Sequence, residues 1–320
     1  MRALTTTTTG HDHSLRLTER PVPNPQADEV TIDVEAAGIG LIDAFWASGY
    51  MPQQAGFVPG LEVAGTIREL GQSVAGFRVG QRVAALLTGA GGFADVVRAT
   101  PALVTPIPDG LTTTHAAVVP VNTVTAHLAL TKVARLEGGE SVLVHAGAGG
   151  LGSQFAQIAR ELGASRVDAV VGSAAKRQVA GTLGYDNAHL RDEVSTIPDS
   201  TYDVVIDPVG GAATESAFRL LRSGGRLVRV GNASQADDVS LSGMDHWLQN
   251  KTTAGFNVGA WLGEHPDHGT QSLRWALEAV TRGAIHVDLS RTGSLDEHEA
   301  LLAPLLRGET TGKLAFVLKG

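Results

Sequence analysis

The sequence contains no cysteine, and this absence excludes several classes of site at once. Disulfide bonds are ruled out, and so is every zinc site that has thiolate ligands. The 320-residue chain also lacks any run rich in lysine or arginine, and its formal net charge is −8. Because nucleic acids and anionic membranes are bound through basic patches, neither is expected as a main partner.

Long apolar runs are missing as well. No stretch reaches the roughly 18 apolar residues of a membrane-spanning helix, and the N-terminus has no basic segment followed by an apolar one. We therefore expect a cytoplasmic protein. With 43% hydrophobic residues, the chain can bury a large core, and its length predicts about two domains.

The residue pattern divides the chain into three parts. Residues 1–120 hold short β-branched runs between turn residues, which predicts an irregular, mostly antiparallel β unit. Residues 121–255 alternate apolar strands with helical segments, which predicts βαβ units around a parallel sheet. Residues 256–320 hold two amphipathic helices and end in a strand-like segment, which we expect to pack on the first part because a lone strand needs neighbours.

A glycine cluster lies in the middle part, directly after an apolar strand and directly before a helical pattern. In a G-x-G-x-x-G turn the first glycine allows the bend and the second lets the backbone approach a pyrophosphate. The third lets helix and strand pack closely, with the helix N-terminus facing the anion. This context favours a nucleotide site over a plain turn. The expected contacts are Gly147, Gly149, Gly150, Leu151 and Gly152.

The residues after the next strand indicate which dinucleotide binds. An NAD site usually has a carboxylate about 20 residues after the glycines, which binds the ribose hydroxyls. That position falls on Gly172 here, and Ser173, Lys176 and Arg177 follow it. A hydroxyl and two cations suit the 2′-phosphate of NADPH, which a carboxylate would repel. The alternative is that Lys176 and Arg177 form a solvated helix face. We favour NADPH.

Seven segments together carry a resemblance to a known family. They are GIGLIDAFWASGY, PGLEVAGTIRELG, VGQRVAALL, VLVHAGAGGLGSQFAQIARELGA, VVGSAAKR, DVVIDPVGG and GGRLVRVGN, in this order. The sequence resembles the zinc-independent quinone oxidoreductase branch of the medium-chain dehydrogenase/reductase superfamily. The resemblance implies an α/β protein: residues 1–120 and 256–320 would form a GroES-like catalytic domain, and residues 121–255 a Rossmann domain with a doubly wound parallel sheet. It also implies homodimers joined through the Rossmann sheets, and small hydrophobic, electrophilic substrates.

Zinc-dependent relatives bind the metal through a cysteine and through the histidine of a Gly-His-Glu motif. This motif reads Gly60, Leu61 and Glu62 here, so no metal site is expected. Two histidine pairs, His11 with His13 and His265 with His268, stand in polar, loop-like sequence and are interpreted as solvated surface.

Without a metal to stabilise an oxyanion, hydride transfer favours a conjugated acceptor, in which negative charge spreads onto the carbonyl oxygen. The resemblance places Tyr50 at the substrate site as the candidate phenol, although it could equally be a packed aromatic residue. Asp43 matches a family aspartate and could instead only stabilise its loop. Two positions depart from the family: Gly40 replaces a usual asparagine, and Phe45 replaces a second tyrosine.

Other functional positions are also transferred from the resemblance. Asp207 looks like a catalytic acid but is expected to end the fourth Rossmann strand and cap the following turn. Lys313 could equally be a surface lysine. The further expected cofactor contacts are Thr125, Asn232, Phe256, Val258 and Lys313.

Three functions remain open from the sequence. The first is an NADPH-dependent reductase of quinones or of α,β-unsaturated carbonyls. The second is a non-catalytic NADPH-binding sensor or structural protein, which the losses at Gly40 and Phe45 permit. The third is an enoyl-thioester reductase, against which the acidic first part argues because an acyl carrier would need a basic entrance.

Overall fold

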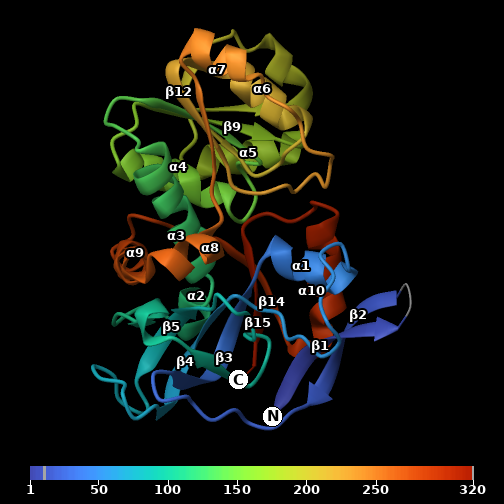
Figure 1. The fold of residues 1–320 in the computed structure, drawn as a ribbon, viewed down its shortest axis with the longest axis vertical. Coiled ribbons are helices and arrows are strands. Elements are labelled where there is room, and N and C mark those ends of the chain that lie inside the picture. Colours follow the sequence, from blue (N-terminus) through green and yellow to red (C-terminus); the bar gives the residue numbers. More distant parts are fainter. Residues whose placement is uncertain (10–11, 319–320) are drawn as a thin grey trace. The chain divides into compact units, whose positions relative to one another are not determined.

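The computed structural model describes residues 1–9 and 12–318 of the chain. These residues divide into two compact units (Figure 1). The chain begins in unit 1, continues into unit 2 and returns to unit 1, apart from a three-residue segment, Ala284–His286, that belongs to unit 2. Unit 1 comprises Met1–Val124, Leu262–Gly283 and Val287–Gly320, and unit 2 comprises Thr125–Trp261 and Ala284–His286.

Unit 1 is built on a seven-stranded, largely antiparallel sheet in the order β14-β15-β3-β4-β5-β7, with β6 pairing β3. The C-terminal strand β15 pairs antiparallel with β3, which confirms that the chain end packs onto the first part. A separate antiparallel ribbon consists of β1 (Arg2–Thr9) and β2 (Asp12–Glu19). The sheet strands are β3 (Val30–Ile39), β4 (Glu62–Leu70), β5 (Arg82–Leu86), β6 (Val96–Ala99), β7 (Val104–Pro106), β14 (Leu289–Gly293) and β15 (Lys313–Val317).

In unit 1, the ends of helix α1 are set by glycine residues. α1 starts after Gly40, whose N–H donates to the Asp43 carboxylate, and stops at Gly49, which has a φ of +75° that favours glycine. The predicted amphipathic segments near the C-terminus form α9 and α10. The helices are α1 (Leu41–Ser48), α2 (Thr113–Ala116), α3 (Pro120–Leu128, shared with unit 2), η1 (Pro101–Leu103), α9 (Pro266–Thr281), η4 (Leu295–Glu297) and α10 (His298–Leu306).

Unit 2 is a six-stranded parallel sheet in the order β10-β9-β8-β11-β12-β13. Numbered along the chain, this order is third, second, first, fourth, fifth, sixth, which is the doubly wound order of dinucleotide-binding folds. The fold class predicted from the sequence is confirmed. The strands are β8 (Ser141–His145), β9 (Arg166–Val171), β10 (Asn187–Leu190), β11 (Tyr202–Asp207), β12 (Leu221–Arg229) and β13 (Thr252–Gly255).

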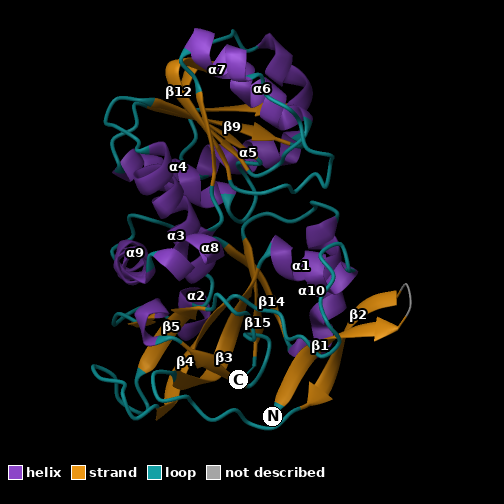
Figure 2. Cartoon of the chain, in the orientation of Figure 1, coloured by secondary structure: helices purple, strands orange, loops and turns teal. Residues whose placement is uncertain are grey.

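Helices flank this sheet, as Figure 2 shows. α4 packs on β8 and β9, α5 on β9 and β10, and α6 on β11 and β12. Asp207 ends β11 and accepts hydrogen bonds from the N–H groups of Val209 and Gly210, so its expected capping role is confirmed. The helices are η2 (Ala129–Ala134), α4 (Gly152–Glu161), α5 (Ala174–Thr182), η3 (Arg191–Thr196), α6 (Ala212–Leu220), α7 (Gly243–Gln249) and α8 (Val258–Glu264, shared with unit 1).

Within residues 1–9 and 12–318, no helix combines the length and the apolar character needed to cross a bilayer.

Candidate functional site

The glycine turn follows β8 and leads into α4, at the point where the strand order of unit 2 reverses. A Cβ on Gly147 would lie 2.6 Å from the Cβ of Ala169, and one on Gly152 would lie 2.2 Å from the carbonyl oxygen of Ala146. Both positions therefore need glycine, because a side chain would push strand and helix apart. Ala146 itself has a φ of +53°, a conformation that is rare for residues other than glycine.

Gly149 is different because its outer side is open. An added Cβ would meet only the Ala146 carbonyl oxygen, at 3.3 Å. Leu151 is the N-cap of α4, and the Ser153 hydroxyl donates to the carbonyl oxygen of Gly150 at 3.0 Å. The turn thus combines close strand–helix packing, an open backbone face and the first turn of a helix, which fits a pyrophosphate.

Beside this turn, a cation occupies the place where an NAD site has its carboxylate. A Cβ on Gly172 would lie 3.1 Å from Nη2 and 3.3 Å from Cζ of Arg191, so the guanidinium lies directly over the glycine. Arg191 is the first residue of η3, immediately after β10. It forms no ion pair with any residue that the structure describes. The sequence alone did not identify Arg191, because only the pairing of β10 with β9 brings it to Gly172.

The cations expected after β9 have different surroundings. The Ser173 hydroxyl accepts a hydrogen bond from the Lys176 N–H at 3.3 Å and caps α5. Burial lowers the pKa of Lys176, and the neighbouring Arg191 lowers it further. Arg177 is paired with the carboxylate of Glu193. Lys176 and Arg191 are both cations and repel each other. A phosphate dianion bound to both would relieve this repulsion.

The other expected cofactor contacts of unit 2 follow β12 and β13. The N–H of Phe256 donates to the Arg229 carbonyl oxygen at 2.8 Å, and Asn232 lies against Gly210. Val258 begins α8, and Thr125 is buried on α3. An open hollow of about 660 Å³ lies at the carboxyl ends of the two strands. Its lining residues are Arg229, Val230, Gly231, Thr253, Ala254, Gly255, Phe256 and Asn257.

The two candidate catalytic residues lie in unit 1. Tyr50 is 44% exposed, and its ring meets that of Phe45 edge to face at 4.9 Å. Asp43 is buried and accepts hydrogen bonds from the N–H groups of Gly40 at 2.8 Å and Gly60 at 2.9 Å. Burial raises the pKa of Asp43 to about 7, against the lowering effect of these two donors. Asp43 thus joins α1 to the Gly60 segment.

Lys313 lies inside unit 1 and is almost fully buried. Its ammonium donates to the Glu62 carboxylate at 2.5 Å and to the Ile39 carbonyl oxygen at 3.3 Å. The second oxygen of Glu62 accepts from the Val121 N–H at 2.7 Å, at the start of α3. In the sequence, Glu62 is noticed only as the last residue of the Gly-His-Glu motif, in which Leu61 replaces the histidine. A direct contact between Lys313 and a cofactor stays a prediction.

No group of three or more histidine, aspartate or glutamate residues that could hold a metal occurs within residues 1–9 and 12–318. The rings of His265 and His268 lie 5.1 Å apart. His11, from the other pair, falls outside the described residues.

Two family descriptions match the sequence. "Alcohol dehydrogenase GroES-like domain" matches residues 26–109, and "Zinc-binding dehydrogenase" matches residues 150–279. A curated relative, a phenolphthiocerol/phthiocerol polyketide synthase protein of Mycobacterium tuberculosis, is 32% identical over 301 residues. This match covers 91% of the present chain but only 14% of that protein, so the chain spans a small part of the relative's length.

Solved structures extend the likeness over nearly the whole chain. The quinone oxidoreductase of Thermus thermophilus, solved also in complex with NADPH, is 30% identical with a TM-score of 0.84, covering 99% of this chain and 100% of that one. A mycobacterial protein complexed with NADPH is 26% identical with a TM-score of 0.88, covering 99% of each chain.

Proposed function

Because this chain belongs to the medium-chain dehydrogenase/reductase superfamily, in its quinone oxidoreductase branch, we propose that it is an NADPH-dependent reductase of quinones or α,β-unsaturated carbonyls. One observation carries the cofactor assignment: the Arg191 guanidinium lies over Gly172, and its charge lowers the pKa of Lys176. These cations favour a 2′-phosphate and offer nothing to accept hydrogen bonds from a free 2′-hydroxyl.

The glycine turn would hold the pyrophosphate, and the hollow beside Phe256 would take the nicotinamide half. NADPH, when bound, supplies the hydride. A conjugated acceptor suits this protein because Leu61 stands where zinc-dependent relatives carry a histidine ligand. Hydrogen bonds from side chains must then hold the acceptor's carbonyl oxygen as charge develops on it.

Tyr50 is the proposed donor to that oxygen and the source of the proton that completes reduction. Its exposed hydroxyl is available to a substrate, while its ring is fixed by Phe45. Asp43, buried and bonded to two backbone N–H groups, would act by holding α1 and therefore the segment that ends at Tyr50.

The match to a polyketide synthase favours a second candidate, the reduction of an enoyl thioester. Both candidates deliver hydride to the β-carbon of a conjugated carbonyl and differ in what the carbonyl is attached to. The third candidate is a non-catalytic NADPH sensor. Turnover of any acceptor would exclude this role.

The experiment is NADPH oxidation by the purified, chelator-treated protein, followed by the loss of reduced-nicotinamide absorbance. The acceptors are a quinone, a cyclic enone, an aliphatic enal, an enoyl thioester and a saturated ketone. Turnover of the conjugated acceptors but not of the saturated ketone supports the proposal, and a strong preference for the thioester selects the second candidate. Binding of NADPH without turnover of any acceptor would leave the sensor function.

We also propose that the protein forms homodimers through unit 2. β13 pairs with β12 alone among the described strands, so its other edge is free to pair with a second copy. The adjacent α7 exposes Met244, Trp247 and Leu248 and buries none of its residues. A free edge beside exposed apolar side chains is typical of an interface. The cytoplasmic location stays a prediction.

A further inference from the structure

Arg177 and Glu193 connect α5 to η3, the helix whose first residue is Arg191. Arg177 lies in α5, and its guanidinium pairs with Oε2 of Glu193 in η3. The same oxygen accepts a hydrogen bond from the Leu190 N–H at 2.8 Å. One carboxylate oxygen therefore fixes the first turn of η3, whose first residue is Arg191, and ties that turn to α5.

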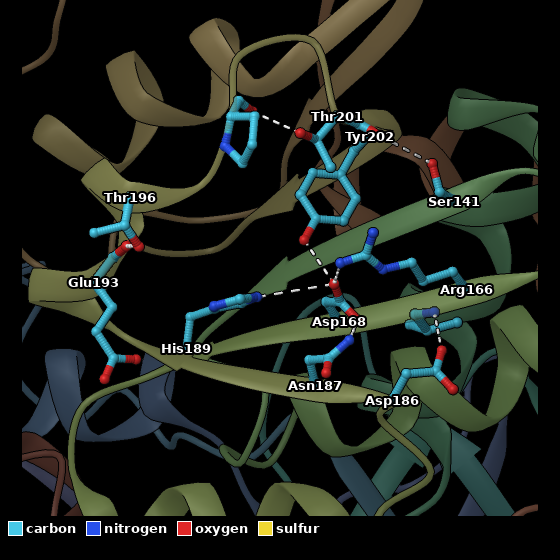
Figure 3. A network of polar contacts seen from close by, with 12 residues as sticks. Ser141, Arg166, Asp168, Asp186, Asn187, His189, Glu193, Thr196, Thr201 and Tyr202 are labelled. Carbon is cyan, nitrogen blue, oxygen red and sulfur yellow. Dashed lines mark hydrogen bonds and ion pairs between the residues drawn. The ribbon is translucent and has the colours of Figure 1, made fainter.

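The other end of β10 is fixed independently, by the buried carboxylate of Asp168 in β9. Figure 3 shows Asp168 at the centre of a polar network, with Glu193 separate from it. Asn187 donates to Asp168 at 3.0 Å, and the Tyr202 hydroxyl donates at 2.7 Å. β10 is thus held at its start by Asp168 and just past its end by Glu193, which leaves the backbone that carries Arg191 little freedom.

We propose that Arg177 and Glu193 form a positioning pair that places Arg191 over Gly172 to bind the 2′-phosphate of NADPH. This inference rests on the proposed function, and it gives Arg177 a different role from the direct phosphate contact that the sequence favours. Arg177 acts through Glu193 and η3, while Arg191 and Lys176 meet the phosphate.

Electrostatics support this division of roles. Glu193 neutralises Arg177, so the pair adds little net positive field at the site, whereas Arg191 has no carboxylate partner among the described residues. Arg177 holds the pKa of Glu193 down at about 2, so the pair stays ionised at any pH at which the protein would work. In addition, the Arg191 guanidinium lies over Gly172 because that residue has no Cβ, which would be 3.1 Å from Nη2.

Arg177 could contact the phosphate directly or position Arg191 through Glu193. These two roles predict opposite effects on the affinity for the phosphate when Glu193 is replaced. Removing a negative charge near a bound anion tightens binding if the pair has no structural task. If the pair positions Arg191, removing Glu193 weakens binding, because η3 loses both its tie to α5 and the acceptor for Leu190. Glu193→Ala is therefore the decisive variant, and Arg177→Gln is not, because both roles predict weaker binding for it.

The test measures calorimetric binding of adenosine 2′,5′-bisphosphate and of AMP to the intact protein, so it needs no catalysis. We expect Glu193→Ala and Arg177→Gln each to raise the Kd for the bisphosphate about three- to tenfold, with the Kd for AMP unchanged. The double variant should be no worse than either single one, because both break the same link. Arg191→Gln should raise the Kd about tenfold or more.

Glu309→Ala serves as the matched control, because it removes the carboxylate of an exposed Arg307–Glu309 pair in unit 1. Its Kd should equal that of the wild type, and thermal unfolding of every variant reports folding. If wild type binds the bisphosphate no better than AMP, the NADPH assignment itself is wrong. If wild type discriminates but Glu193→Ala binds as tightly as wild type or more tightly, the NADPH assignment holds and the positioning role is overturned.

Discussion

Lys313 and Glu62, which are 251 residues apart in the sequence, form an ion pair inside unit 1, with 2.5 Å between Nζ and Oε1 and side-chain exposures of 1% and 2%. The pair joins β15 to β4, and the second oxygen of Glu62 binds the first turn of α3 through the Val121 N–H. Three segments from distant parts of the chain therefore depend on one carboxylate.

Lys313→Met should lower the free energy of unfolding by about 3 to 5 kcal/mol, because it leaves a buried carboxylate without its counter-charge. Urea denaturation measures the loss. Lys251→Met is the control: Lys251 is also buried, but its ammonium donates to the Phe218 carbonyl oxygen at 2.9 Å rather than to a carboxylate. A loss at Lys313 no larger than that at Lys251 would mean that the ion pair is not what stabilises this region.

Asp43 predicts a dependence of stability on pH. Its pKa is raised in the folded protein, from an ordinary value of 3.8 to about 7. The folded state then binds the proton more tightly than the unfolded state, so stability from Asp43 is full below about pH 4 and is lost as the pH rises to about 7. Asp43→Asn cannot ionise, so its destabilisation relative to wild type should be smaller at about pH 8 than at about pH 5.

Denaturant unfolding of both proteins at the two pH values gives this difference directly. Asn can accept only one of the two hydrogen bonds from Gly40 and Gly60, so the variant should be less stable than wild type at about pH 5. A cost that is the same at both pH values, or larger at the higher one, would show that the pKa of Asp43 is not raised in the folded state.

The fold could be predicted from the sequence because its signals are local. The glycine turn, the alternation of strands with helices and the capping aspartate Asp207 each occupy a short stretch with its own geometric requirement. The return of the last strand to unit 1 followed from the need of any strand for a neighbour, although its partner β3 could not be identified beforehand.

The site was less predictable, because its decisive contacts join distant residues. Arg191 reaches Gly172 only through the parallel pairing of β10 with β9, which brings together residues 19 positions apart in the sequence and lets the guanidinium lie where a side chain at Gly172 would be. Arg177 follows Lys176 directly in the sequence and has the same charge. Only the structure shows that the carboxylate of Glu193 pairs with Arg177. A lysine is normally expected on the surface because its side chain is charged. The burial of Lys313 is explained by its ion pair with Glu62, which the sequence does not reveal.

Gly172→Asp should change the preference for the cofactor. The added Cβ would crowd the Arg191 guanidinium, 3.1 Å away, and the carboxylate would pair with this cation and repel a 2′-phosphate. We expect the Kd for NADPH to rise at least about tenfold, and the Kd for NADH to fall or stay unchanged. Quenching of tryptophan fluorescence by each nucleotide measures both constants.

Gly172→Ala separates space from charge, because it adds the Cβ without the carboxylate. It should weaken NADPH binding less than Gly172→Asp does, and it should leave NADH binding unchanged. If Gly172→Asp keeps the wild-type preference for NADPH, the 2′-phosphate is bound elsewhere and not at Arg191.

Tyr50→Phe tests the proposed proton donor. The ring and its edge-to-face contact with Phe45 are kept, so thermal stability should not change. Loss of the hydroxyl should lower kcat for an enone about ten- to hundredfold with little change in KM, because the lost hydrogen bond acts mainly on the developing oxyanion. Steady-state kinetics with NADPH in excess measures this, and a kcat within about twofold of wild type would remove Tyr50 from the mechanism.

Trp247→Glu tests the proposed dimer. Trp247 is 70% exposed on α7, a helix whose His246 contacts the Thr253 hydroxyl of β13 at 3.0 Å, and a charge there would be buried without a partner if two copies met at this face. We expect wild type to sediment as a dimer and Trp247→Glu as a monomer with unchanged circular dichroism. Val79→Glu is the control, because Val79 is also exposed, at 64%, but lies in unit 1. Dissociation of the dimer by both substitutions, or by neither, would place the interface on another surface, and a wild type that sediments as a monomer would show that there is no dimer.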